Sequence, residues 1–409
     1  ASLKILLANI ILFVPNHSTL FISILGICKM LFCTALSIAN PHAFYRIAGF
    51  PLLSLMRNCY TNLYLSKAMK SPLLRFTPKG IYCEAADVYL DPWRPVNKAI
   101  ISHGHADHSR WGHQQYITHH RNVPIITHRL GKINSTGKEW GETFTVNGVK
   151  FSLHPAGHII GSSQIRVEHK GEVWVFTGDY KLEDDGVATP YEVITCHTFI
   201  TECTFGLPAF LWRPQQEVIH DINSWWAENR ANGQTSVLFG YSLGKAQRLL
   251  KHLDPSIGKI YTHGAVEKMT EVLRSLTHFP ETELITRDTK KEDIKGNIVI
   301  APPSAHGSTW IRKMTPFVTA TASGWMAFRG ARRRRAIDKG FVLSDHCDWP
   351  GLLTAIKETG AEKIICTHGY TDIFSKYLKT LGYDARTEST QFEGENGEIN
   401  TPSEKVEAE

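Results

Sequence analysis

The hexapeptide from His103 to His108, "HGHADH", concentrates groups that bind transition metals. In an extended or turning segment, positions i and i+2 point the same way, so His103 and His105 can ligate one ion. Asp107 and His108 can then face a second ion about 3.5–4 Å from the first, as in two-metal sites. Imidazole and carboxylate ligands suit zinc, and manganese is also compatible. The pattern predicts half of a site for two Zn²⁺ ions.

A lone HxH would more often be a solvated, histidine-rich loop, so the surrounding elements must decide. Short β-rich runs along the chain repeatedly stop at a potential ligand or acidic residue, which is where α/β folds place chemistry. The runs are "GIYCEAADVYLD" ending at Asp91, "NKAIISHGH" ending at His105, "VKFSLHPAGH" ending at His158, "EVWVFTGD" ending at Asp179, "HTFITE" ending at Glu202 and "EKIICTHG" carrying His368. This recurrence favours a metal site at the ends of several strands.

The same pattern predicts an α/β protein of two domains. Between residues 207 and 340 helical and strand-like segments alternate, as in "QQEVIHDINSWWAENRANG" followed by "TSVLFGYS", which indicates an inserted, nucleotide-fold-like domain. We expect the first domain to comprise residues 69–206 and to resume at 341–393. The polar segment 394–409 reads as a tail.

Residues 1–68 differ from the rest of the chain. The first acidic residue of the protein is Glu84, and the apolar N-terminal runs are interrupted by Pro15 and Lys29. The segment could be a poor membrane anchor or signal sequence. We favour a spurious start, with translation beginning at Met69, and assign no function to residues 1–68.

Composition sets only broad limits. The chain has 409 residues, a formal net charge of +6 and a pI near 8.8, which suits an anionic partner such as nucleic acid without demanding one. Its 8 cysteines form no CxxC pair. We therefore expect a reducing compartment, the cytoplasm, and no membrane partner.

The motifs "HGHADH", "PAGHIIGS", "FTGDY" and "THGY" resemble the successive metal motifs of the metallo-β-lactamase fold, an αββα sandwich. By this resemblance His103, His105 and His158 hold one zinc ion, and Asp107, His108 and His368 hold the other. It also implies that Asp179 bridges the two ions and that Asp91 supports the site from behind the ligands.

Three further motifs, "TECTFG", "FGYSLGKAQRLL" and "LSDHCDW", resemble those of the β-CASP subgroup, whose inserted α/β domain accompanies nuclease activity on DNA or RNA. Glu202, His346 and His368 would be its motifs A, B and C. The stretch "GWMAFRGARRRRAIDKGFVLSDHCDW" is similar to bacterial DNA ligase-associated exonucleases, which work in DNA repair with an ATP-dependent DNA ligase and a DEXH-box helicase. A histidine at motif C is more typical of RNA-cutting members, so an RNA-processing enzyme stays open.

These assignments give each residue a role. The catalytic candidates are Asp107, Asp179, Glu202 and His346, with His346 protonating the leaving 3′ oxygen while Glu202 orients it. Lys245, at a predicted helix start, could hold a substrate phosphate or could serve only in helix capping. Arg329 and Arg332, at the beginning of a basic run, could grip a nucleic-acid backbone or form a solvated face.

Two other functions remain possible from sequence. A small-molecule hydrolase of the same fold would act on a thioester, lactone or β-lactam, although an inserted domain over the metal site favours a thin, strand-like substrate. An inactive scaffold should lack some of the seven expected metal ligands, and the sequence has them all.

Overall fold

The computed structural model describes residues 71–328, 330, 333 and 336–392, all but the first of which fall in one compact unit beginning at Pro72. The predicted N-terminal extension 1–68, the tail 394–409, Arg329 and Arg332 lie outside the described residues. Within this described part, no helix has both the length and the apolar character needed to cross a lipid bilayer.

Sheet 1 contains six strands in sequential order. They are β1 (Arg75–Thr77), β2 (Gly80–Cys83), β3 (Val88–Leu90), β4 (Lys98–Ile100), β5 (Gln115–His119) and β6 (Ser135–Lys138). The first three strands are antiparallel and the last four are parallel. The run that we predicted as one strand ending at Asp91 is instead the β2–β3 hairpin, which turns through Asp87 at a positive φ of 53°.

Sheet 2 contains seven strands in the order β19-β18-β11-β10-β9-β8-β7. They are β7 (Phe144–Val146), β8 (Val149–Pro155), β9 (Ser163–His169), β10 (Glu172–Phe176), β11 (Thr198–Cys203), β18 (Lys363–Gly369) and β19 (Asp384–Thr387). Strands β10, β11, β18 and β19 run parallel, and the others are antiparallel.

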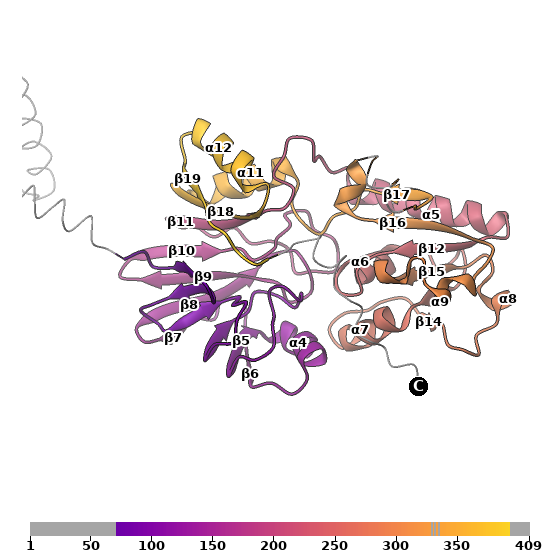
Figure 1. The fold of residues 1–409 in the computed structure, drawn as a ribbon, viewed down its shortest axis with the longest axis horizontal. Helices are drawn as coiled ribbons and strands as arrows, with labels where there is room; N and C mark the ends of the chain where they lie inside the picture. The colour runs from indigo at the N-terminus through magenta and orange to yellow at the C-terminus, as the bar shows by residue number, and fades with distance from the viewer. Residues whose placement is uncertain (1–70, 329, 331–332, 334–335, 393–409) are drawn as a thin grey trace, which may run out of the picture. The chain divides into compact units, whose positions relative to one another are not determined.

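Sheets 1 and 2 form one lobe with helices on both outer sides (Figure 1). Apolar side chains of sheet 1, such as Ile81 and Ile100, share a buried core with Phe151 and Ile200 of sheet 2. The other face of sheet 2 packs on α11 (Trp349–Thr359) and α12 (Thr371–Thr380), and that of sheet 1 packs on α4 (Val123–Leu130), which follows the short helix η2 (His120–Asn122). The lobe is therefore layered helix, sheet, sheet, helix.

Sheet 3 is entirely parallel and forms a second lobe. Its strands, in the order β14-β13-β15-β12-β16-β17, are β12 (Thr235–Phe239), β13 (Ile260–Thr262), β14 (Glu283–Leu284), β15 (Ile298–Ala301), β16 (Phe317–Ala322) and β17 (Lys339–Phe341). Its helices are α5 (Gln215–Ala231), α6 (Lys245–His252), α7 (Gly264–Arg274), α8 (Lys291–Ile294) and α9 (Thr309–Arg312), with short helices η3 (Pro303–Ala305) and η4 (Gly324–Ala327).

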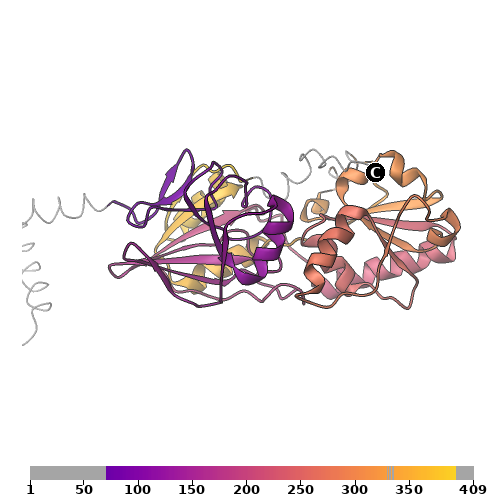
Figure 2. The same ribbon diagram turned by 90° about the horizontal axis from the view of Figure 1, so that it is seen from below.

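Both faces of sheet 3 are covered, which explains why β12, "TSVLF", is buried at every position. Leu238 packs against the side of α5, α6 and α7, whereas Val237 and Phe239 pack toward α8 and α9. Figure 2 shows helices on either side of these strands. Helix α5 follows Pro214 and gives way to Gly233, whose φ of +68° few other residues adopt, as its sequence predicts.

The second lobe is an insertion in the first. Strands β11 and β18 pair in parallel although the whole of sheet 3 lies between them in the sequence. The chain returns through residues 342–348, a loop between β17 and α11 that contains His346. The proposed boundaries at residues 207 and 340 stay predictions.

Candidate metal centre

The predicted ligands meet because each follows or ends a strand of the first lobe. The loop after β4 carries His103, His105 and His108. The loops after β8 and β10 carry His158 and Asp179, respectively. These strands end at one edge of the two packed sheets, so residues far apart in sequence share one buried site.

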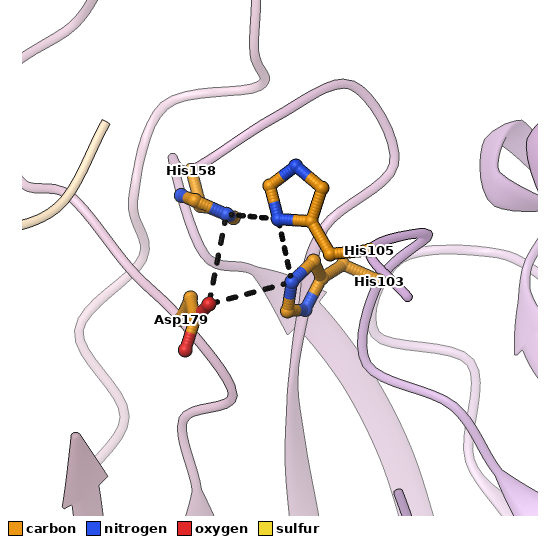
Figure 3. Close-up of side chains that lie close together, drawn as sticks. All are labelled: His103, His105, His158 and Asp179. Atoms are coloured by element: carbon orange, nitrogen blue, oxygen red, sulfur yellow. Dashed lines mark hydrogen bonds and ion pairs between the residues drawn. The ribbon is translucent and has the colours of Figure 1, made fainter. Parts of the chain in front are cut away.

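Four ligands form the first group: His103, His105, His158 and Asp179. Nδ1 of His105 lies 3.2 Å from Nε2 of His103 and 3.1 Å from Nε2 of His158. Oδ2 of Asp179 lies 3.5 Å and 3.8 Å from the same Nε2 atoms. Figure 3 shows the three rings and the carboxylate pointing toward one another.

Hydrogen bonds on the far side of two rings fix which nitrogen faces the site. Ser102 donates its hydroxyl proton to Asp91, so its oxygen accepts from Nδ1 of His103 at 2.9 Å. Asp91 also accepts from Nδ1 of His108 at 2.7 Å. His103 and His108 therefore each present an Nε2 lone pair to the site, as ligating histidines do.

Backbone carbonyls fix the orientation of the His105 and His158 rings. Nδ1 of His158 donates to the Asp345 carbonyl at 2.8 Å, and Nε2 of His105 donates to the Leu243 carbonyl at 3.2 Å. Three lone pairs, on Nε2 of His103, Nδ1 of His105 and Nε2 of His158, consequently converge. Lone pairs at about 3 Å repel each other rather than hydrogen-bond, so this donor set fits a cation between them.

The second group consists of His108, Asp179 and His368. Oδ1 of Asp179 lies 3.4 Å from Nε2 of His108 and 3.1 Å from Nε2 of His368. These three atoms are buried and have no hydrogen-bond partner among the described residues, which again fits a metal ion. Asp179 thus directs Oδ2 to the first group and Oδ1 to the second, the arrangement predicted for a bridging carboxylate.

Asp107 lies at the edge of the second group. Its Oδ2 is 3.7 Å from Nε2 of His108, and its side chain is partly exposed. Asp91, by contrast, is fully buried behind the ligands and adopts a positive φ of 39°, a strained conformation that its bonds to Ser102 and His108 maintain.

Burial sets the protonation of the first group. It lowers the pKa values of His103 and His105 and brings the pKa of His158 to about 3, so that these rings are neutral and able to ligate. Burial opposes charge on Asp179 as well, but His108 and His346 beside it outweigh burial and lower its pKa. The first group therefore combines three neutral imidazoles with an ionised carboxylate.

A carboxylate and a histidine lie beside the metal groups. Nδ1 of His346 donates to Oε1 of Glu202 at 2.7 Å, and both side chains are buried. Glu202 is held in turn by the backbone N–H groups of Tyr180 and Thr204. Although burial opposes its ionisation, His346 lowers the pKa of Glu202. Asp179 lies within ligand distance of this pair, so three of the four predicted catalytic residues, all but Asp107, lie together.

Comparison with known proteins gives relatives but no matching family model. The chain is 32% identical over 311 residues to a probable DNA ligase of Opitutus terrae, covering 75% of this chain and 30% of that protein. It is 31% identical over 124 residues to endoribonuclease ysh-1 of Neurospora crassa, covering 30% of this chain and 14% of that protein. It is also 24% identical over 302 residues to endoribonuclease YSH1 of Eremothecium gossypii, covering 59% of this chain and 39% of that protein.

These similarities agree with the ordered motifs and their convergence in space. The chain belongs to the β-CASP family of the metallo-β-lactamase fold. It spans between 14% and 39% of the length of these three relatives. A crystal structure of a protein of unknown function from Enterococcus faecalis shares the fold at a TM-score of 0.50 and 13% identity, covering 72% of this chain and 80% of that one.

Lys245, predicted as a possible substrate contact of this β-CASP protein, is buried inside the protein. Lys245 has no exposed surface, and its Nζ donates to the Leu343 carbonyl at 2.8 Å and pairs with Asp345 at 3.1 Å. This placement contradicts the predicted phosphate contact, because the ammonium is directed into the protein and not to a substrate surface. The position of Lys245 at a predicted helix start did not reveal this burial.

Lys245 belongs to a buried ionic network. Arg248, one turn along α6, donates to the Ser344 carbonyl and to Oδ1 of Asp345 at 3.0 Å. Burial would raise the pKa of Asp345, but Lys245 and Arg248 outweigh it and hold it well below its usual value. Because the Asp345 carbonyl accepts from His158, this network supports a metal ligand. Sequence reasoning missed Ser102, Arg248 and Asp345, none of which has a ligand-like spacing.

Another histidine-containing group lies away from the centre. His119, His120 and Glu139 bring possible ligand atoms together, but His120 and Glu139 are exposed. The His119 ring stacks on Trp140 with centroids 3.4 Å apart and accepts from the Arg121 N–H at the start of η2. These contacts fit a structural role for His119.

Proposed function

We propose that this chain is a metal-dependent phosphodiester hydrolase, a DNA exonuclease of DNA repair, built as a metallo-β-lactamase αββα sandwich with an inserted β-CASP domain. The observation that carries the proposal is the sharing of Asp179 between two buried imidazole groups, with the Glu202–His346 pair beside it. We propose the domain boundaries given above, with residues 69–206 and 341–393 forming the sandwich.

The residues would hold two zinc ions, or manganese, in two groups. His103, His105 and His158 would bind one ion, His108 and His368 the other, and Asp179 both, with Asp107 at the open edge of the second group. When bound, such ions lower the pKa of water and neutralise charge on phosphoryl oxygens. The Asp91 and Asp345 contacts orient the rings that the ions require.

His346 supplies the proton that the departing oxygen needs. The Glu202 carboxylate accepts from Nδ1, fixes the ring plane and stabilises an imidazolium, so that the ring can donate from Nε2. Protonation of the leaving 3′ oxygen gives 5′-phosphate and 3′-hydroxyl products. We propose this acid role for His346 and an orienting role for Glu202.

DNA is favoured by the long match to a protein named probable DNA ligase, and this supports a partnership with a DNA ligase. An ATP-dependent ligase and a DEXH-box helicase are the partners that the resemblance to ligase-associated exonucleases implies. A ribonuclease is the second candidate, favoured by the endoribonuclease relatives and by His368 at motif C. The described cysteines are all free and buried, which supports a reducing compartment, the cytoplasm. Arg329 and Arg332 remain proposed backbone contacts.

The test is cleavage of matched, end-labelled single-stranded DNA and RNA by the full chain with zinc or manganese. Asp179→Asn and His346→Ala serve as variants, and a thioester serves as a small-molecule substrate. Stepwise shortening of DNA that both variants lose supports the proposal. Cleavage of RNA alone transfers it to a ribonuclease, and hydrolysis of the thioester alone refutes nuclease function.

A further inference from the structure

Six aromatic rings form a cluster beside the metal centre: Phe205, Phe210, Trp212, Trp325, Phe328 and Tyr370. Phe205 and Phe210 follow β11, Trp325 belongs to η4, and Phe328 lies just beyond it. Tyr370 precedes α12, two residues after His368. Three separate segments of the chain, from both lobes, therefore contribute to this aromatic cluster.

Phe210 is the buried centre of the cluster. Its ring centroid lies 5.0 Å from that of Phe328, 5.8 Å from that of Trp325 and 5.9 Å from that of Tyr370. The Phe328 and Trp325 rings meet it edge to face, the geometry that aromatic pairs favour. A rigid buried ring thus supports three others.

The cluster reaches the catalytic residues through Phe205. The Phe205 ring lies 4.8 Å from Phe210 and 6.0 Å from His346 between centroids. Gly324 allows η4 to approach closely, because a Cβ at this residue would lie 2.5 Å from the Phe205 ring. The rings supported by Phe210 are therefore held in a fixed relation to the proposed proton donor.

The supported rings are open to solvent to different degrees. Phe328 is 40% exposed, whereas Trp325 and Tyr370 are half-buried. The indole N–H of Trp325 is buried and has no hydrogen-bond partner among the described residues. The exposed ring of Phe328 offers an apolar surface on which a planar group can stack.

We infer that Trp325, Phe328 and Tyr370 form a stacking platform for the bases of a single DNA strand. This rests on the proposed nuclease function and adds the substrate form, since bases in a duplex are not available to stack on protein rings. A nucleic acid fits better than a protein segment because the platform adjoins the proposed phosphodiester site. In the sequence, Arg329 directly follows Phe328, and a basic run begins three residues later.

Stacking can be distinguished from phosphate contacts because only stacking requires the bases of the strand. A base stacked on an aromatic side chain strengthens binding about 5- to 150-fold. A strand with the same phosphates and sugars but without bases should bind correspondingly more weakly. Removing the exposed ring of Phe328 should remove most of that difference.

The experiment measures binding to the metal-loaded full chain by fluorescence anisotropy. The probes are a phosphorothioate-linked decathymidylate, which resists cleavage, and the same strand with tetrahydrofuran sites in place of the thymidines. The variants are Phe328→Ser, which removes the ring, and Phe328→Tyr, which retains it. Leu381→Ser removes an exposed apolar side chain from the end of α12 and is the matched control.

We expect wild type to prefer the base-bearing strand by about tenfold or more, Phe328→Tyr and Leu381→Ser to keep this preference, and Phe328→Ser to lose most of it. Equal binding of the two strands by wild type, or an unchanged preference in Phe328→Ser, overturns the platform. If wild type still cleaves unmodified DNA in that case, the nuclease proposal survives. If it neither binds nor cleaves DNA, both proposals fail.

Discussion

Replacing Asp345 by asparagine tests whether the ionic network of α6 supports the metal centre. Asp345 is almost fully buried between Lys245 Nζ at 3.1 Å and Arg248 NH1 at 3.0 Å. Asn has the same shape but no charge, so the substitution removes the carboxylate charge that these two buried cations share. Removing one partner of a buried ion pair destabilises a protein by about 3–5 kcal/mol.

Lys245→Met provides an internal comparison. It removes one of the two cations beside Asp345 but leaves the Arg248–Asp345 pair intact, so the carboxylate keeps a buried partner. It also deprives the Leu343 carbonyl of a hydrogen bond, a loss of about 1–3 kcal/mol. Asp254→Asn makes the same chemical change at an exposed carboxylate and should have almost no effect. We therefore expect destabilisation in the order Asp345→Asn, Lys245→Met, Asp254→Asn.

Metal affinity provides a second readout. The Asp345 carbonyl accepts from His158, and disturbing the contacts behind a ligand typically weakens metal binding about 10- to 100-fold. Thermal unfolding followed by circular dichroism measures the first effect, and competition for zinc with a chromophoric chelator measures the second. The reasoning is refuted if Asp345→Asn matches Asp254→Asn in stability, or if it binds zinc as tightly as wild type.

Three other predictions follow from single residues. Gly178→Ala should weaken zinc binding at least about tenfold, because the new Cβ would lie 2.6 Å from the hydroxyl oxygen of Ser102. Gly148→Ala is the control, since Gly148 also has a positive φ but has open space around it, and its zinc affinity should not change. Equal zinc affinities of the two variants would contradict this prediction. Glu202→Gln should slow phosphodiester cleavage about 10²- to 10⁴-fold with unchanged zinc content, and loss of zinc would instead mean that Glu202 serves the metal. Burial lowers the pKa of His113 to about 4, so the unfolded chain binds a proton at a higher pH than the folded chain, and stability falls as the pH drops from 6.5 toward 4. The melting temperature of His113→Leu should therefore fall less than that of wild type over this pH range. Parallel pH curves for the two proteins would argue against this role of His113.

The sequence indicated which histidines and aspartates lie close together because each of them follows a recognisable strand. Strands that end at one sheet edge bring His103, His158 and Asp179 together, and each residue type already suits a metal. The alternation of helices and strands likewise predicted the inserted parallel sheet. The β2–β3 turn was missed because no glycine or proline marks it and Asp87 itself takes the positive φ.

Long-range contacts explain what the sequence could not give. Lys245 resembles a phosphate ligand beside its glycine, yet its partner is the Leu343 carbonyl, 98 positions away. Asp345 directly precedes His346 in the sequence, yet its backbone carbonyl accepts a hydrogen bond from His158. The aromatic cluster joins three segments with no common motif. Such contacts depend on how the two lobes pack, which residue spacing does not encode.

The most direct test of the central claim is a zinc titration of the metal-free full chain, with cleavage of end-labelled single-stranded DNA followed in the same samples. Two groups that share Asp179 predict that cleavage rises until two zinc ions are bound per chain and then levels off. His368→Ala, which removes a ligand of the second group only, should bind one ion tightly and cleave poorly. Full cleavage at one bound ion, or two bound ions without cleavage of any polynucleotide, would contradict the account.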